Sequence, residues 1–251
     1  MAANQAVPSP SIRVRDASLA YSGTSLFDRL DFDLAGGVCT CLLGPSGIGK
    51  TSLLRLVAGL APPGLRGEVA TGDGAPLAGR VAYMAQQDLL LPWLGLLDNL
   101  TLGGRLRGEP AATDRARDLL ARVGLTGREN ALPATLSAGM RQRTALARTL
   151  TEGRPVVLMD EPFSALDAIT RLKLQALAAE LLDGRTVLLV THDPLEALRL
   201  GHRIHVMAGR PARLDDALVP PGPPPRDPAD PALLALQGEL LDRLAAAGGA
   251  A

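Results

Sequence analysis

Three short stretches of the chain are almost continuously apolar, at residues 38–43, 156–160 and 186–191. Runs of this length predict strands that are buried on both faces, as in a parallel sheet. Between the second and third runs, residues 171–182 carry Leu and Ala at helical spacing, which predicts a strand, a helix and a strand in a βαβ unit. The pattern therefore predicts an α/β fold built on a mainly parallel sheet.

A different pattern occurs near the N-terminus. Residues 11–21 and 28–34 alternate apolar and polar positions, which predicts half-exposed antiparallel strands. Gly-bounded short strands are expected to continue through residues 66–84. These segments predict an antiparallel β subdomain that wraps the start of the core.

Helical spacing dominates the middle of the chain, from residue 86 to residue 150. Helices are expected at 98–106, 113–123 and 139–150, with Thr113 as the N-cap of the second. Because this stretch interrupts the series of strands, it predicts an inserted helical subdomain.

The C-terminal part begins with a dense series of prolines at residues 219–231, which predicts an extended linker. Residues 232–247 then predict an amphipathic helix. The sequence thus divides into a domain at 11–210, with its helical subdomain at about 86–150, and a C-terminal part at 211–251. No internal repeat is visible.

Composition narrows the possible partners. The 251 residues balance 26 Lys and Arg against 26 Asp and Glu, so no net field favours nucleic acid or an anionic membrane surface. No run reaches the roughly 18 apolar residues that span a bilayer, which predicts a soluble intracellular chain. Cys39 and Cys41 have no second cysteine pair, which favours reduced thiols over a zinc site.

The clearest chemical motif follows the first apolar run and matches the phosphate-binding pattern G-x-x-x-x-G-K-[ST]. Glycines allow backbone N–H groups to turn towards a triphosphate without a side chain in the way. The lysine supplies an ammonium for the β and γ phosphates, and the threonine hydroxyl is a ligand for Mg²⁺. The predicted nucleotide-binding residues are Gly44, Pro45, Ser46, Gly47, Ile48, Gly49, Lys50, Thr51 and Ser52.

Two carboxylates end the second apolar run. Asp160 is placed to hold Mg²⁺ opposite Thr51, and Glu161 to orient or deprotonate an attacking water. Without the phosphate loop, Asp-Glu-Pro would be a capped turn. Ser137 begins another helix whose free N–H groups suit a phosphate, although taken alone it is simply an N-cap.

In this order the motifs resemble the ATP-binding subunits of ATP-binding cassette (ABC) transporters, over residues 12–210. The resemblance implies an ABC ATPase fold with ATP and Mg²⁺ as cofactors. It assigns adenine stacking to Tyr21, a metal-sensing glutamine to Gln86, and a γ-phosphate contact to His192. In the same comparison, residues 136–143 resemble the family's signature motif, Asp160 and Glu161 its Walker B pair, and residues 164–167 its D-loop.

The same resemblance implies a shared site. ATP on one subunit is closed by Ser137 and Gly139 of a second copy, in a head-to-tail homodimer. Glu161, His192 and Gln86 are the implied catalytic residues, and Thr51, Gln86 and Asp160 the implied metal ligands. Integral-membrane permease subunits and, indirectly, a solute-binding protein are the expected partners, at the cytoplasmic face of the inner membrane, with no nucleic acid.

Two features bear on the solute and on turnover. Ala138 replaces the usual signature glycine, which predicts retained but slower hydrolysis. The Leu-Pro-Trp-Leu run at 91–94 and residues 40–47 resemble importers of nitrate, sulfonate or taurine, and particularly of the thiamine precursor hydroxymethylpyrimidine. The apolar residues 89–94 are either core packing or a docking groove for a partner helix.

Other functions remain to be weighed. A soluble ABC-type ATPase acting on nucleic acid or ribosomes is the alternative, and it would be expected to carry a second cassette, a coiled-coil insertion or a basic arm. A P-loop kinase or GTPase is disfavoured by Ser137 ahead of Asp160 and by His192.

Overall fold

The computed structural model describes residues 9–21 and 24–249. Its core is a six-stranded sheet, whose strands lie in the order β5 (Val81–Met84), β6 (Val156–Asp160), β7 (Thr186–Val190), β3 (Cys39–Leu43), β8 (Arg203–Ala208) and β9 (Arg213–Leu214). Neighbours from β5 to β8 are parallel, and β9 is antiparallel to β8. The predicted α/β class and mainly parallel sheet are confirmed.

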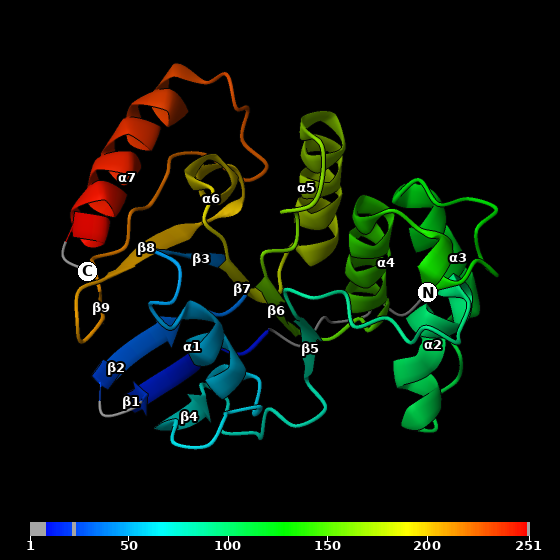
Figure 1. Ribbon diagram of the computed structural model, residues 1–251, viewed down its shortest axis with the longest axis horizontal. Helices are drawn as coiled ribbons and strands as arrows, with labels where there is room; N and C mark the ends of the chain where they lie inside the picture. The colour runs from blue at the N-terminus through cyan, green and yellow to red at the C-terminus, as the bar shows by residue number, and fades with distance from the viewer. Residues whose placement is uncertain (1–8, 22–23, 250–251) are drawn as a thin grey trace.

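Both faces of this sheet are buried, which explains the continuous apolar runs. Val156 and Leu158 of β6 contact one hydrophobic cluster, whereas Val157 and Met159 contact the other. The helices α5 (Ala168–Leu182), α6 (Pro194–Leu200) and α7 (Pro231–Gly249) cover one face (Figure 1). Because side chains alternate along a strand, both faces of β6 are apolar up to Asp160, which ends the strand.

A three-stranded antiparallel sheet lies on the other side, in the order β2 (Thr24–Leu34), β1 (Ile12–Tyr21) and β4 (Arg66–Thr71). Helix α1 (Lys50–Val57) contributes its apolar face to the cluster shared by the two sheets. The predicted β subdomain is therefore present. It does not include β5, however, which pairs with β6 in the core sheet.

The helical subdomain contains α2 (Leu96–Leu106), α3 (Thr113–Arg122), the short 3₁₀ helix η1 (Pro133–Thr135) and α4 (Ala138–Thr151). All lie at one end of the core sheet in Figure 1. The expectation that Thr113 caps α3 is wrong, because the N-cap is Ala112 and no side chain caps the helix. Thr113 is instead the first helical residue, where a backbone N–H needs no intrahelical partner.

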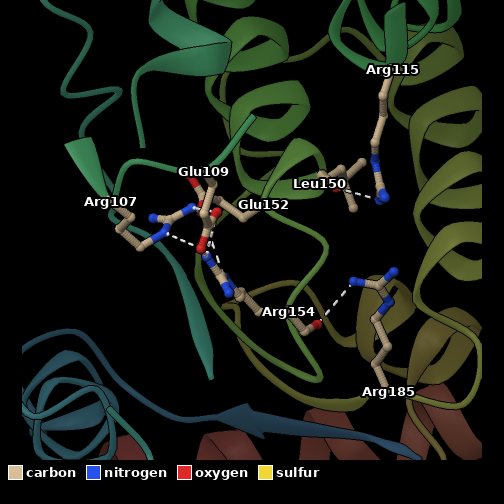
Figure 2. Close-up of polar contacts among 7 residues, drawn as sticks. All are labelled: Arg107, Glu109, Arg115, Leu150, Glu152, Arg154 and Arg185. Carbon is tan, nitrogen blue, oxygen red and sulfur yellow. Dashed lines mark hydrogen bonds and ion pairs between the residues drawn. The ribbon is translucent and has the colours of Figure 1, made fainter. Parts of the chain in front are cut away.

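Charged side chains close the far end of this subdomain (Figure 2). Arg107 pairs with Glu152 at 2.6 Å and with Glu109 at 3.0 Å, and Arg154 pairs with Glu109 at 2.7 Å. Arg185 donates to the backbone oxygen of Arg154 at 2.9 Å. The network joins the connections after α2 and α4 to the starts of β6 and β7.

The proline-rich segment is bound to the core. Arg226 within it is buried, and its guanidinium donates to five backbone oxygens, of Leu198, Gly201, Pro220, Pro221 and Gly222. Helix α7 then packs against α6 and β8 and adds its own leucines to the core cluster. A linker was expected here, but its buried arginine holds the segment in place.

Candidate functional site

The phosphate-binding loop connects β3 to α1, as expected. Gly44 has φ +149°, and a Cβ there would lie 2.6 Å from the Met207 carbonyl oxygen. Gly49 precedes α1 with φ +110°, and a Cβ there would lie 2.8 Å from the Phe27 ring. Gly47, also at positive φ, has open space around it. Two of the three glycines are therefore required by the protein's own packing, not only by a phosphate.

Lys50 opens α1 and is 8% exposed. Its ammonium donates to the carbonyl oxygens of Gly44 at 2.7 Å and Pro45 at 2.9 Å. Burial lowers the pKa of Lys50, and the nearby Glu161 and Asp160 carboxylates oppose that shift. The positive charge is thus held at the mouth of the loop, where a compact ammonium suits a phosphate.

A hydrogen bond joins the loop to the neighbouring strand. The Thr51 hydroxyl donates to Asp160 Oδ2 at 2.7 Å. Asp160 ends β6, is 2% exposed, and has a raised pKa, chiefly because burial disfavours its charged form. These two oxygens are hard donors of the kind that Mg²⁺ prefers, so the residues present fit that ion.

Glu161 directly follows β6 and faces His192. Its Oε2 lies 2.9 Å from His192 Nδ1, and its backbone N–H donates to the Val190 oxygen at 2.9 Å. Glu161 has φ +49°, a conformation that is costly for a residue with a Cβ. The ends of β6 and β7 thus bring together an acidic and an imidazole side chain that sequence reasoning had linked only by family resemblance.

The signature residues lie elsewhere. Ser137 caps α4, where its Oγ accepts from the Met140 N–H at 3.2 Å. A Cβ on Gly139 would lie 3.2 Å from the Ala165 oxygen. Helices α1 and α4 stand well apart in Figure 1, and within the described residues neither Ser137 nor Gly139 bonds to the phosphate loop.

Gln86 follows β5 and is exposed. It lines a cavity of about 420 Å³ between residues 84–89 and the start of α4, which Ala138 also lines. Among the described contacts, none joins Gln86 to Thr51 or Asp160, so its metal role stays a prediction. Tyr21 ends β1, and its side chain lies outside the described part of the structure.

The apolar residues 89–94 after Gln86 were expected either to pack in the core or to form a docking groove, and the structure shows some of them buried and others exposed. Leu90 is buried, whereas Leu89 is 56% and Trp93 71% exposed. Asn99 is fully buried and fixes the segment, accepting from the Leu91 N–H at 2.8 Å and donating to three backbone oxygens. The exposed Leu89 and Trp93 side chains therefore belong to a segment whose backbone is held by hydrogen bonds to Asn99.

Two buried polar residues near the site were missed from the sequence. Gln142 of α4 bonds to the turn after β6. Glu196 of α6 is 4% exposed, and burial raises its pKa to about 8. It lines a small cavity of about 30 Å³ together with Glu161 and His192. Asp193 is the N-cap of α6, three residues before Glu196. Neither Gln142, shortly after the predicted Ser137 cap, nor Glu196 carries a sequence signal of burial.

A phosphate loop, a buried carboxylate bonded to its threonine, and a second carboxylate paired with an imidazole define a nucleotide-binding ATPase of the P-loop class. The ABC transporter family model matches residues 27–164. The chain belongs to the ABC transporter family and is an ATP-binding, ATP-hydrolysing member of it.

Individual relatives and a solved structure support this family assignment. An uncharacterized ABC transporter ATP-binding protein of Haemophilus influenzae is 42% identical over 93% of this chain and 98% of its own. The aliphatic sulfonates import ATP-binding protein SsuB 2 of Burkholderia cenocepacia is 42% identical over 93% of this chain and 87% of its own. A dimeric ATP-binding cassette in a post-hydrolysis state with ADP and Pi matches with TM-score 0.73 and 27% identity, over 84% of this chain and 99% of that one.

Proposed function

We propose that the chain is the energy-supplying subunit of an importer and that Glu161 activates the water that cleaves ATP. The observation that carries the catalytic part is the Glu161 to His192 contact of 2.9 Å beside the phosphate loop. A carboxylate fixed by an imidazole is suited to accept a proton from water and to hold the nucleophile in line with a phosphoryl group.

The remaining residues take complementary roles. Lys50 and the backbone N–H groups of the loop bind the β and γ phosphates, and His192 adds a contact to the γ-phosphate. Thr51 and Asp160 would hold Mg²⁺, with Gln86 as a further ligand. When bound, the ion neutralises charge on the phosphate oxygens.

The second half of the site is proposed to come from another copy. Ser137 and Ala138 are exposed at the start of α4, where free N–H groups favour an anion. The related cassette bound to ADP and Pi is dimeric. A head-to-tail homodimer places Ser137 and Gly139 of one copy against the nucleotide of the other.

A membrane permease is the proposed partner of the surface around Gln86. Leu89 lines the 420 Å³ cavity and is exposed, as is Trp93 four residues further on, and large exposed apolar side chains suit a partner helix. The described helices include none long and apolar enough to cross a bilayer. In this proposal the chain acts at the cytoplasmic face of the inner membrane through that permease.

The proposed solute is an aliphatic sulfonate, because a relative at 42% identity carries that name. Nitrate, taurine and hydroxymethylpyrimidine are the alternatives from sequence resemblance, and the relatives reported above do not include one named as a pyrimidine importer. A solute-binding protein and the permease would hold the solute. A soluble ABC-type ATPase acting on nucleic acid or ribosomes is the alternative function.

The test is reconstitution of the full chain with its permease and binding protein in vesicles, with ATP turnover measured against each solute. We expect stimulation by an alkanesulfonate and none by hydroxymethylpyrimidine. Stimulation by the pyrimidine alone would overturn the solute, and copurification with ribosomes but no membrane partner would overturn transport. Glu161→Gln should lower turnover at least ~100-fold and trap an ATP-bound dimer. Normal turnover in this variant would overturn the role of Glu161.

A further inference from the structure

Gln142 connects the signature helix to the residues that follow β6. It is 7% exposed and lies on α4, five positions after Ser137. Its Nε2 donates to the Glu161 carbonyl oxygen at 2.9 Å and to the Ser164 hydroxyl at 3.2 Å. Its Oε1 accepts from the Ala165 N–H at 2.6 Å. The Gln142 amide thus acts as both donor and acceptor towards a single turn, residues 161–165.

This contact supports a strained residue. The backbone of Glu161, at φ +49°, lies in the left-handed region, which is unfavourable for a residue with a Cβ. Such a conformation persists only where its surroundings fix it. The Val190 oxygen holds the Glu161 N–H, and Gln142 holds the Glu161 carbonyl. Glu161 is therefore fixed from β7 on one side and from α4 on the other.

The same helix carries the residues expected to meet the partner's ATP. Ser137 and Gln142 are about 8 Å apart along α4, given a rise of about 1.5 Å per residue. Gly139 lies close to Ala165, whose N–H also bonds to Gln142. The start of α4 is therefore connected to Glu161 by one helix and a short hydrogen-bonded path.

We propose that Gln142 is a positioning residue that couples the two ATP sites of the dimer. ATP held by the partner's phosphate loop draws the start of α4 into place, and Gln142 then fixes Glu161 for ATP on its own subunit. Each site thereby reports its occupancy to the other. This inference rests on the proposed function, in which Glu161 activates water and Ser137 closes the partner's site.

The test uses the full-length protein and Gln142→Met, which keeps the side-chain volume and removes the amide. Loss of the three hydrogen bonds between Gln142 and the turn should lower kcat about 10- to 100-fold. KM for ATP should change less than about threefold, because no ligand contact is removed. The Hill coefficient for ATP should fall towards 1, because the path between the sites is broken.

A matched control on the same helix is Thr144→Val. Thr144 is fully buried, and its hydroxyl donates only within α4, to the Met140 oxygen at 2.9 Å. We expect its kcat and Hill coefficient to match the unaltered chain. If Thr144→Val lowers both as much as Gln142→Met does, the effect belongs to helix packing and the inference is overturned.

A double variant separates positioning from general damage. Adding Gln142→Met to Glu161→Gln should leave residual turnover and ATP-dependent dimer formation unchanged, because the group that Gln142 positions is already lost. A further fall in either quantity would indicate structural damage and contradict the inference. If Glu161→Gln alone keeps normal turnover, the proposed function fails first, which is a distinguishable result.

Ser164→Ala provides a variant that is safe for folding, because Ser164 is exposed. Its hydroxyl accepts from Gln142 and donates to the Glu161 oxygen at 3.1 Å. We expect a smaller fall in kcat, about threefold, together with a lower Hill coefficient. Unchanged kcat and cooperativity in both Ser164→Ala and a folded Gln142→Met would overturn the proposal.

Discussion

On the P-loop side, the buried Lys50 and Asp160 and the partly buried Thr51 are bonded within the chain, whereas Ser137 and Ala138 at the start of the signature helix face solvent. Lys50, Thr51 and Asp160 all have partners among the loop and β6. Ser137 and Ala138 are exposed, and among the described residues Ser137 bonds only to its own helix. This contrast supports the proposal that the start of the signature helix of a second copy closes the site.

Lys50→Ala tests the first region and has the largest expected effect. Without the ammonium, ATP binding and turnover should fall by at least ~100-fold, because a charge-assisted contact to phosphate is lost. The chain offers a matched control, since its only other lysine, Lys173, is exposed on α5. Lys173→Ala should bind and hydrolyse ATP normally. A nucleotide-binding titration of the two variants measures the difference in ATP affinity. Equal losses of affinity in Lys50→Ala and Lys173→Ala would contradict a special role for Lys50.

Glu196→Gln tests how the buried carboxyl group of Glu196, next to Glu161 and His192, affects the stability of the fold. Burial raises the pKa of Glu196 from 4.5 to about 8, so between these values the folded chain holds one proton more than the unfolded chain. The free energy of unfolding therefore decreases as pH rises from about 4.5 to 8, by up to ~5 kcal/mol, and is then level.

Glu196→Gln should remove this decrease and raise the melting temperature most at pH 8 and above. Denaturant unfolding at pH 5 and pH 8.5 measures the difference. Gln175 Nε2 lies 3.4 Å from Glu196 Oε2, so Gln175→Met serves as a control that alters the neighbour without removing the acid. An identical pH dependence in Glu196→Gln and the unaltered chain would refute the assignment.

Much of the P-loop side was predictable because its motifs are local. The continuous apolar runs indicated β3, β6 and β7, and the motif spacing indicated Lys50, Thr51 and Asp160. Partners distant in sequence could not be predicted. Strand β5 looked like part of the β subdomain because strand pairing is not encoded locally, and Arg226 looked like a residue of a free linker.

The contacts of Gln142 show the same limit on the signature side. A glutamine on a predicted helix is usually solvated, and nothing in its spacing indicates that Glu161 lies against it. The Ser137 cap was predicted correctly because capping depends on nearby residues. The site residues that depend on another copy were inferred only through family resemblance.

Ala138→Gly tests the second region and has the smallest expected effect. The Ala138 methyl is exposed at the first position of α4, where it would lie close to a phosphate from the partner. Removing it should raise turnover about twofold, less than about 0.5 kcal/mol in activation free energy. Steady-state turnover and ATP-dependent dimerisation measure the change. If both stay the same, the methyl has no consequence for closure.

The division of the site between two copies is tested most directly by mixing two inactive variants, Lys50→Ala and Ser137→Arg. Half of the dimers that form at random are mixed, and each of these has one site with both an intact phosphate loop and an intact signature. The account predicts that the mixture regains up to about a quarter of normal ATP turnover, although each variant alone has almost none. No recovery on mixing, with both variants folded and dimers exchanging, would contradict it.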